Sequence, residues 1–283
     1  MNEIAIVGVG LIGGSLALAL RRGLPGLRIL GVDSNSSALE QARAAGAIDA
    51  AATLEQLGSC DAVVLALPAP ELAALLPLLA ARMRPGATLT DVCGAKERVC
   101  ALGAAQERVV FVGAHPMAGT EFRGFAAASA QLFAGATVAL CPPAGKQEGR
   151  ARATGQVSEL WRAAGARKLL EVGPAEHDRA VAYASHLPYL AAAAVVESLA
   201  GAGEAQALAR ELAAGGFRDT TRLAGDGTVS GAASLNRFVP AAARDLAERL
   251  RALALLLEAD PAAALVRLGA LADERRQMPL PAR

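Results

Sequence analysis

The residue best placed for acid–base chemistry is His115, one of three histidines in the sequence. It follows an apolar run at residues 109–112, which predicts a buried strand, and it is followed by Pro116 and a Gly-Thr-Glu turn. An imidazole with a pKa near neutrality can accept the proton of a hydroxyl group while a hydride leaves the same molecule. His115 is therefore predicted to be either a general base or a structural histidine, and its position alone favours neither.

The other two histidines stand in different surroundings. His177 lies in the charged stretch Glu-His-Asp at the start of a predicted helix, which favours a solvated surface position. His186 lies in Ser-His-Leu-Pro-Tyr, where Pro188 lacks an N–H and is expected to kink an apolar helix. Polar groups freed by the kink could bind a substrate, so His186 is a candidate site residue. A core histidine with its hydrogen bonds satisfied is the alternative.

Two arginines form a second candidate site. Arg218 and Arg222 follow the paired glycines at residues 215–216. Their guanidinium groups could hold a carboxylate through bidentate hydrogen bonds. Surface ion pairs with Asp219 and Asp226 are an equal alternative.

A glycine pattern near the N-terminus predicts a dinucleotide site. The buried strand expected at residues 4–7 stops at Gly8, and Gly10 and Gly13 complete the pattern before a helix. Gly8 permits a tight turn, Gly10 lets the backbone approach a pyrophosphate, and Gly13 allows close packing of helix on strand. Strand, turn and helix together are a stronger signal than the glycines alone.

The same segment predicts the choice of cofactor. The N-terminus of the helix, at Leu11 and Ile12, would offer unpaired N–H groups to the phosphates. Asp33 ends the next apolar run and would accept hydrogen bonds from the ribose hydroxyls. A 2′-phosphate would be repelled there, and residues 34–42 contain no Arg or Lys to neutralise it. The sequence therefore favours NAD over NADP.

A third apolar run, at residues 62–67, ends at Pro68. Loops at the carboxyl ends of central parallel strands lie over the cofactor in such folds, so Leu67 and Pro68 are predicted to contact it. A proline that simply ends the strand is the alternative.

Strands and helices alternate through the first part of the chain, which indicates a parallel sheet with right-handed crossovers. From residue 176 onward, Ala and Leu recur at helical spacing. We therefore predict an α/β fold, with a Rossmann-type doubly wound parallel sheet over residues 1–173 and an all-helical domain over residues 174–283. Because the helices carry apolar stripes on more than one face, part of their surface is expected to form a homodimer interface. Strands are expected at residues 4–7, 27–32, 62–67, 87–92, 109–112, 136–140 and 167–172, and the later helices at 178–199, 204–214, 240–257 and 261–275.

Composition narrows the classes of function. With 53% apolar residues the chain can bury a sizeable core, and its 28 basic and 27 acidic residues give a net charge of +1. Neither a nucleic-acid partner nor a membrane surface is indicated, so a small-molecule partner is expected. The four cysteines show no CxxC pairing, and no signal peptide is evident. A reduced, metal-free cytoplasmic protein is predicted.

Four segments together resemble the successive signatures of the prephenate and arogenate dehydrogenase family of tyrosine biosynthesis. They follow the order and spacing of that family over nearly the whole chain: residues 8–15 (GVGLIGGS), 115–121 (HPMAGTE), 185–188 (SHLP) and 216–222 (GFRDTTR). The resemblance implies a dinucleotide domain, a helical dimerisation domain and an active site between them.

The resemblance also implies the chemistry, which is the NAD-dependent oxidative decarboxylation of a cyclohexadienyl substrate. As base, His115 would take the proton of the ring hydroxyl while a hydride passes to NAD. The dienone would then lose its ring carboxylate as CO2, and aromatisation would make the step effectively irreversible. The residues implied to bind substrate are Thr120, His186, Tyr189, Arg218 and Arg222, and Gly94 is implied to contact the cofactor.

Three positions depart from the family pattern. Gly94 stands where a serine commonly touches cofactor and substrate, and Tyr189 stands where prephenate-specific members tend to carry a histidine. Ser230 lies in the segment that aligns with a Trp-Arg-Asp stretch, whose arginine prephenate-specific members also tend to carry. An arginine that holds the side-chain carboxylate of prephenate suits arogenate less well, because arogenate adds an ammonium. Arogenate or dual use is therefore favoured, with an amino-substituted prephenate analogue of a specialised pathway as the alternative.

Two further classes compete with this interpretation. An imino acid reductase or β-hydroxyacid dehydrogenase would share the architecture, but the turn that begins at His115 argues against both. A dinucleotide-sensing protein without catalysis is the other alternative, and the three departures give it some support. Because the last predicted helix ends shortly before Arg283, no appended regulatory or chorismate mutase domain is expected.

Overall fold

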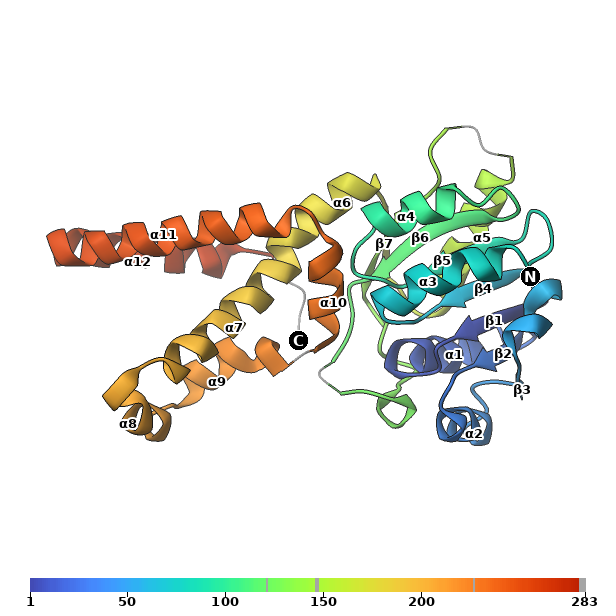
Figure 1. The fold of residues 1–283 in the computed structure, drawn as a ribbon, viewed down its shortest axis with the longest axis horizontal. Helices are drawn as coiled ribbons and strands as arrows, with labels where there is room; N and C mark the ends of the chain where they lie inside the picture. Colours follow the sequence, from blue (N-terminus) through green and yellow to red (C-terminus); the bar gives the residue numbers. More distant parts are fainter. Residues whose placement is uncertain (121, 146–147, 226, 280–283) are drawn as a thin grey trace. The chain divides into compact units, whose positions relative to one another are not determined.

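The computed structural model describes residues 1–120, 122–145, 148–225 and 227–279 (Figure 1). Within these residues, eight strands form one sheet in the order β3-β2-β1-β4-β5-β6-β7-β8. Strand order reverses between β1 and β4, and ligands of such sheets bind outside the carboxyl ends of the strands at this point. The strands are β1 (Glu3–Val7), β2 (Arg28–Val32), β3 (Ala50–Ala51), β4 (Ala62–Leu65), β5 (Thr88–Asp91), β6 (Val110–Pro116), β7 (Thr137–Cys141) and β8 (Lys168–Glu171).

The predicted doubly wound parallel sheet is confirmed, and one pair of its strands is antiparallel. Neighbouring strands from β3 to β6 are parallel, whereas β6 pairs with β7 antiparallel. The connection between them, which contains the short 3-10 turn η2 (Phe125–Ala127), returns from the same end of the sheet without a crossover helix. β8 again runs parallel to β7.

Helices cover both faces of the sheet because alternate strand residues are apolar on both sides (Figure 1). In β1, Ile4 and Ile6 pack in one layer while Ala5 and Val7 pack in the other. The first layer is completed by α1 (Leu11–Gly23), α2 (Ser36–Ala44) and α5 (Arg150–Ala163), and the second by α3 (Ala69–Ala80) and α4 (Glu97–Ala104).

The predicted helix over residues 178–199 is three segments in the structure. α6 (Pro174–Val181) passes into a π-helical turn, η3 (Ala182–His186), before α7 (Leu187–Ala200). The wider turn lets Pro188 occupy the start of α7, where a residue needs no N–H for a helical hydrogen bond. The predicted kink is therefore a π turn that ends at His186.

The glycine-rich stretch beyond α7 is more helical than the sequence predicts. α8 (Gln206–Glu211) is shorter than the expected helix at residues 204–214. α9 (Gly215–Thr221) and α10 (Gly227–Leu235) were not predicted, because Gly is a poor helix former. Short 3-10 turns lie at η1 (Leu54–Ser59), η4 (Gly203–Ala205) and η5 (Arg222–Gly225).

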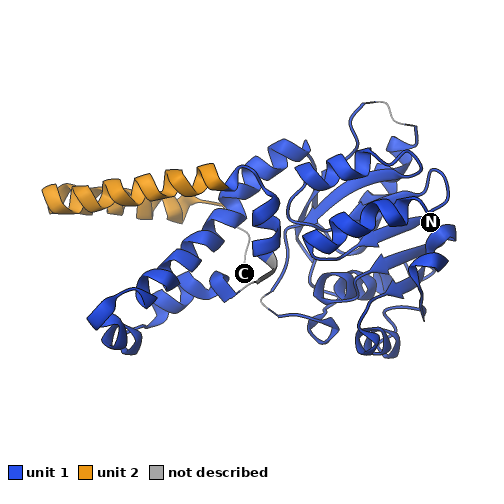
Figure 2. Cartoon of the chain, in the orientation of Figure 1, with its two compact units in different colours: residues 1–239 blue, residues 240–283 orange. Residues whose placement is uncertain are grey.

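The chain divides into two compact units, residues 1–239 and residues 240–283 (Figure 2). The second unit contains the long helix α11 (Val239–Ala259), whose first residue belongs to the first unit, and α12 (Pro261–Gln277). Asp260 caps α12 by accepting a hydrogen bond from the N–H of Ala263. Among the described helices, none is long and apolar enough to cross a membrane.

Candidate functional site

The glycine turn after β1 has the geometry that a dinucleotide requires. Gly8 has φ of 93°, which favours glycine, and a Cβ at Gly13 would lie 1.9 Å from the Gly8 carbonyl oxygen. A Cβ at Gly10 would meet no atom within 4 Å, so the turn is open above this residue. Gly10 also precedes α1 without any side-chain cap, which leaves the N–H groups of the first turn available to an anion. The turn therefore fits a pyrophosphate.

Asp33 lies beside this turn, at the end of β2. Its Oδ2 accepts a hydrogen bond from the Val9 N–H at 2.7 Å, and its Oδ1 accepts one from the Asn35 N–H at 2.8 Å. The half-buried Leu67 reaches the same turn, since its Cδ2 would lie 3.0 Å from a Cβ at Gly8. The structure thus brings these predicted cofactor residues together. Of the remaining ones, Leu11 and Ile12 are half-buried at the start of α1, and Pro68 is exposed.

His115 lies within β6, which continues to Pro116 rather than ending before the histidine as predicted. The strand continues because Gly113 and Ala114 pair with β7 despite their low strand propensity. The half-buried His115 ring places its Nδ1 2.9 Å from Nε2 of His177. His177 in turn places its Nδ1 2.8 Å from Oδ1 of Asp178.

The prediction of a solvated His177 is wrong. This side chain is only 3% exposed, because α6 packs against α4 and the His177 ring contacts the ring of His115 in β6. A sequence signal was present: His177 lies one helical turn before Val181 and so shares its apolar face. The charged neighbours Glu176 and Asp178 obscured it.

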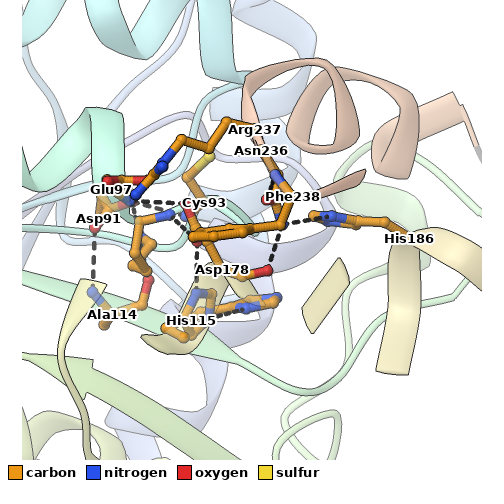
Figure 3. Close-up of polar contacts among 12 residues, drawn as sticks. Asp91, Cys93, Glu97, Ala114, His115, Asp178, His186, Asn236, Arg237 and Phe238 are labelled. Carbon is orange, nitrogen blue, oxygen red and sulfur yellow. Dashed lines mark hydrogen bonds and ion pairs between the residues drawn. The ribbon is translucent and has the colours of Figure 1, made fainter. Parts of the chain in front are cut away.

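Asp178 is the last residue of the hydrogen-bonded series His115, His177 and Asp178 (Figure 3). It is fully buried, and its carboxylate accepts hydrogen bonds from the backbone N–H groups of Lys96 at 2.7 Å and Glu97 at 2.9 Å. Burial acts to raise the pKa of Asp178, but the hydrogen bonds from His177 and these two amides bring the pKa below its usual value. The carboxylate therefore stays charged and caps the start of α4.

A buried ion pair supports the same region. The ammonium of Lys96 binds the Asp91 carboxylate and donates a hydrogen bond to the Ala114 carbonyl at 2.9 Å. Asp91 also accepts hydrogen bonds from the N–H groups of Ala114 at 3.1 Å and Cys93 at 2.8 Å. Burial disfavours the charge of Lys96, yet Asp91 and nearby thiols raise its pKa above the usual value. The pair fixes β5 to β6 one residue before His115.

His115 is poised as a neutral imidazole. Burial, followed by the proximity of His177, Lys96 and His186, holds the pKa of His115 well below its usual value near 6.5. The Nε2 edge of its ring faces Gly94, where an added Cβ would lie 3.5 Å from Nε2. A neutral ring with a free nitrogen at this edge can accept a proton.

His186 joins the cluster through Asn236. The Asn236 amide Nδ2 lies 3.1 Å from His186 Nδ1 and donates to the Asp178 backbone carbonyl at 2.6 Å (Figure 3). Burial lowers the pKa of His186, with Asp178 acting in the opposite direction, so this ring too is kept neutral. No sequence signal pointed to Asn236, which is 2% exposed and lies far from the histidines along the chain.

The other predicted substrate residues have fewer contacts than the residues of the His115 cluster. Thr120 and Tyr189 are half-buried, and the Thr120 hydroxyl accepts a hydrogen bond from the Phe122 N–H at 3.3 Å. Arg218 and Arg222 are exposed, and Arg218 pairs with Asp219 at 3.4 Å. Within the described residues, no hydrogen bond joins either arginine to the His115 cluster. The predicted alternative pairing with Asp226 lies outside the described residues.

Comparison with known proteins places these features in a family. The nucleotide-binding domain of prephenate dehydrogenase matches residues 16–170, and the dimerization domain of the same enzyme matches residues 173–232. A prephenate dehydrogenase of Bacillus subtilis is 35% identical over 228 residues, which cover 79% of this chain and 60% of the relative. This chain thus spans less than two thirds of the length of that relative.

Solved structures agree with this match. Synechocystis arogenate dehydrogenase is 32% identical with a TM-score of 0.78, and the match covers 97% of this chain and 98% of the other. Prephenate dehydrogenase from A. aeolicus, in complex with hydroxyphenyl propionate and NAD+, is 28% identical with a TM-score of 0.88 and 98% coverage of each chain. The predicted dinucleotide-binding domain is confirmed, and the chain belongs to the prephenate dehydrogenase family.

Proposed function

We propose that this protein is an NAD-dependent dehydrogenase that oxidises and decarboxylates a cyclohexadienyl substrate, arogenate or prephenate, to tyrosine or 4-hydroxyphenylpyruvate. The observation that carries the proposal is the geometry of His115, whose Nδ1 lies 2.9 Å from His177 Nε2 and whose Nε2 faces Gly94, a residue without a side chain. Similarity to the Synechocystis and A. aeolicus enzymes supports it. NADH formation with either substrate tests it.

The chemistry assigned to the chain is proton transfer and alignment. NAD, when bound, accepts the hydride from the ring carbon that bears the hydroxyl. His115 accepts the hydroxyl proton at Nε2 as the C–O bond becomes a carbonyl. The bond from the ring to its carboxylate then breaks, its electrons complete the aromatic ring, and the phenol oxygen regains a proton. Because no covalent intermediate is needed, positioning supplies most of the catalysis.

We propose two domains, a dinucleotide-binding domain over residues 1–173 and a helical domain for substrate binding and dimerisation over residues 174–283. Of the proposed substrate residues, Thr120 comes from the first domain and the others from the second. We assign the cofactor to the glycine turn and Asp33 together with Leu67, Pro68 and Gly94. We assign the substrate to Thr120, His186, Tyr189, Arg218 and Arg222.

Arogenate, or dual use of arogenate and prephenate, is the proposed preference. Tyr189 and Ser230 replace the histidine and the arginine-bearing segment typical of prephenate-specific members, and the absence of that arginine disfavours prephenate. A higher kcat/KM for arogenate than for prephenate is expected. An amino-substituted prephenate analogue is the alternative if both substrates turn over poorly.

Replacing Asp33 by serine is expected to narrow the preference for NAD over NADP. The change removes charge-assisted hydrogen bonds to the ribose, worth about 1.5–3 kcal/mol or roughly 10- to 100-fold in affinity, and also the repulsion of a 2′-phosphate. The ratio of kcat/KM for the two cofactors measures this effect. Glu40→Ser, at an exposed position of α2, is the matched control. Equal use of NAD and NADP by the unmutated protein would contradict the role of Asp33.

A homodimer is expected because the helical part exposes large apolar side chains. In the second unit, Leu250 is 59% exposed on α11, and Leu265 and Val266 are 73% and 74% exposed on α12. Side chains of this kind on two helices mark an interface that a second copy of the chain would cover. Light scattering at micromolar concentration should give about twice the chain mass of 28.6 kDa. A stable monomer would leave these side chains unexplained.

A further inference from the structure

We propose that His177 and Asp178 are positioning residues that hold the His115 ring with its proton on Nδ1, so that Nε2 remains an unprotonated base. The inference rests on the proposed function and adds a mechanism for it. It concerns two histidines 62 positions apart in the chain, whose rings meet where α6 packs against α4, the helix that packs on β6. His177 and Asp178 act through His115 and have no direct contact with substrate in this assignment.

The first step determines which ring nitrogen of His177 carries the proton. An ionised carboxylate only accepts hydrogen bonds, so the 2.8 Å contact between Asp178 Oδ1 and His177 Nδ1 places a proton on Nδ1. Asp178 cannot turn away from this contact easily, because Lys96 and Glu97 donate their N–H groups to the same carboxylate. In neutral His177, Nε2 therefore carries a lone pair.

In the second step, the proton position on His177 determines the proton position on His115. His177 Nε2 lies 2.9 Å from His115 Nδ1, so one proton must lie between the two nitrogens. Because His177 Nε2 is the acceptor, the proton belongs to His115 Nδ1. A neutral imidazole has a single ring proton, so His115 Nε2 is left unprotonated.

The third step concerns what the unprotonated nitrogen, His115 Nε2, faces. His115 Nε2 faces the backbone of Gly94, which offers no side-chain donor to occupy it. A substrate hydroxyl that reached Nε2 would lose its proton to this nitrogen, with an O–H bond broken and an N–H bond formed. The new imidazolium would keep its Nδ1 hydrogen bond to His177 and, through His177, the support of the Asp178 carboxylate. Proton return to the phenol oxygen would restore the resting ring.

The surroundings of His115 contain no other acceptor that could set its tautomer among the residues described here. From β5 and the start of α4 the nearby charged pair is Asp91 with Lys96, whose groups bind each other and Ala114. From the π turn, His186 is paired with Asn236. The titratable and charged groups around the ring are thus Asp91, Cys93, Lys96, His177, Asp178 and His186.

Two variants of His177 separate positioning from mere packing. His177→Phe keeps a flat ring but removes both hydrogen bonds, and kcat is expected to fall on the order of 10- to 100-fold, a loss typical of partners that orient a functional histidine. KM should change less than kcat, since no substrate contact is removed. His177→Gln keeps an oxygen acceptor within reach of His115 Nδ1 and should restore most of the lost kcat. A His177→Phe enzyme with kcat within about twofold of wild type would overturn the inference, as would a Gln variant no better than Phe.

The tautomer can also be read directly, without substrate. Long-range 1H–15N spectra of protein labelled only at its three histidines distinguish a protonated from an unprotonated ring nitrogen. We expect His115 to show Nδ1–H with a bare Nε2 in the wild type and the Gln variant, and to lose this pattern in the Phe variant. A wild-type His115 protonated at Nε2 would overturn the inference whatever the protein oxidises. Failure of both substrates to reduce NAD, with the expected tautomer present, would instead contradict the proposed function alone.

Discussion

Replacing His115 by asparagine is expected to lower kcat by about 10²–10⁴, the usual loss when a general base is removed. Asparagine keeps a neutral hydrogen-bonding side chain of similar reach but cannot accept the proton. The affinity for NAD should hardly change, because the glycine turn and Asp33 follow other strands, β1 and β2. KM should change less than kcat.

The pH dependence of kcat gives a second view of the same residue. Protonation removes the lone pair of His115, so kcat should fall as pH decreases through the pKa of this ring. Because burial, followed by the proximity of His177, Lys96 and His186, holds this pKa well below its usual value near 6.5, the fall should occur in acid, below about pH 6.5. The acid limb should vanish in the asparagine variant. A folded variant with near-normal kcat would return His115 to a structural role.

Replacing Lys96 by methionine is expected to have the largest effect on stability, about 3–5 kcal/mol in the free energy of unfolding. Lys96 and Asp91 are both fully buried, and removing the ammonium leaves the carboxylate with backbone N–H groups as its remaining partners. An uncompensated charge in the core is costly because water cannot solvate it. Urea unfolding followed by circular dichroism measures the loss.

Arg28→Met provides the matched control for this substitution. Arg28 forms a 2.7 Å ion pair with Glu3, but its side chain is 61% exposed, and exposed pairs contribute little to stability. The urea midpoint of this control should remain close to that of the wild type. If Lys96→Met shifts the midpoint no more than Arg28→Met does, the buried pair is not what holds β5 to β6.

The positions of the candidate cofactor residues were predictable because their sequence signals are local. The glycine turn, the start of α1 and Asp33 lie within one strand–helix–strand unit, and their spacing alone determines where they meet. Leu67 was placed by the rule for carboxyl ends of parallel strands, and it does reach the turn. Boundaries were less accurate where tertiary pairing extended a weak strand, as it does at Gly113 and Ala114 in β6.

The histidine cluster was not predictable in the same way. His115, His177 and Asn236 come from three distant segments. The packing of α6 against α4, which itself packs on β6, brings the first two together. A Glu-His-Asp stretch looks like a solvated helix start when its neighbours in space are unknown. The antiparallel β6–β7 pair is a similar case, because the direction of a strand is set by the path of its connection rather than by its own residues.

The most direct test of the proposed activity is NADH formation, followed at 340 nm, with NAD and either arogenate or prephenate. Release of CO2 should match NADH one to one, because oxidation leads to loss of the ring carboxylate. We expect turnover with at least one substrate, and a higher kcat/KM for arogenate. A folded protein that binds NAD yet forms no NADH with either substrate would contradict the proposal and favour a dinucleotide-sensing role.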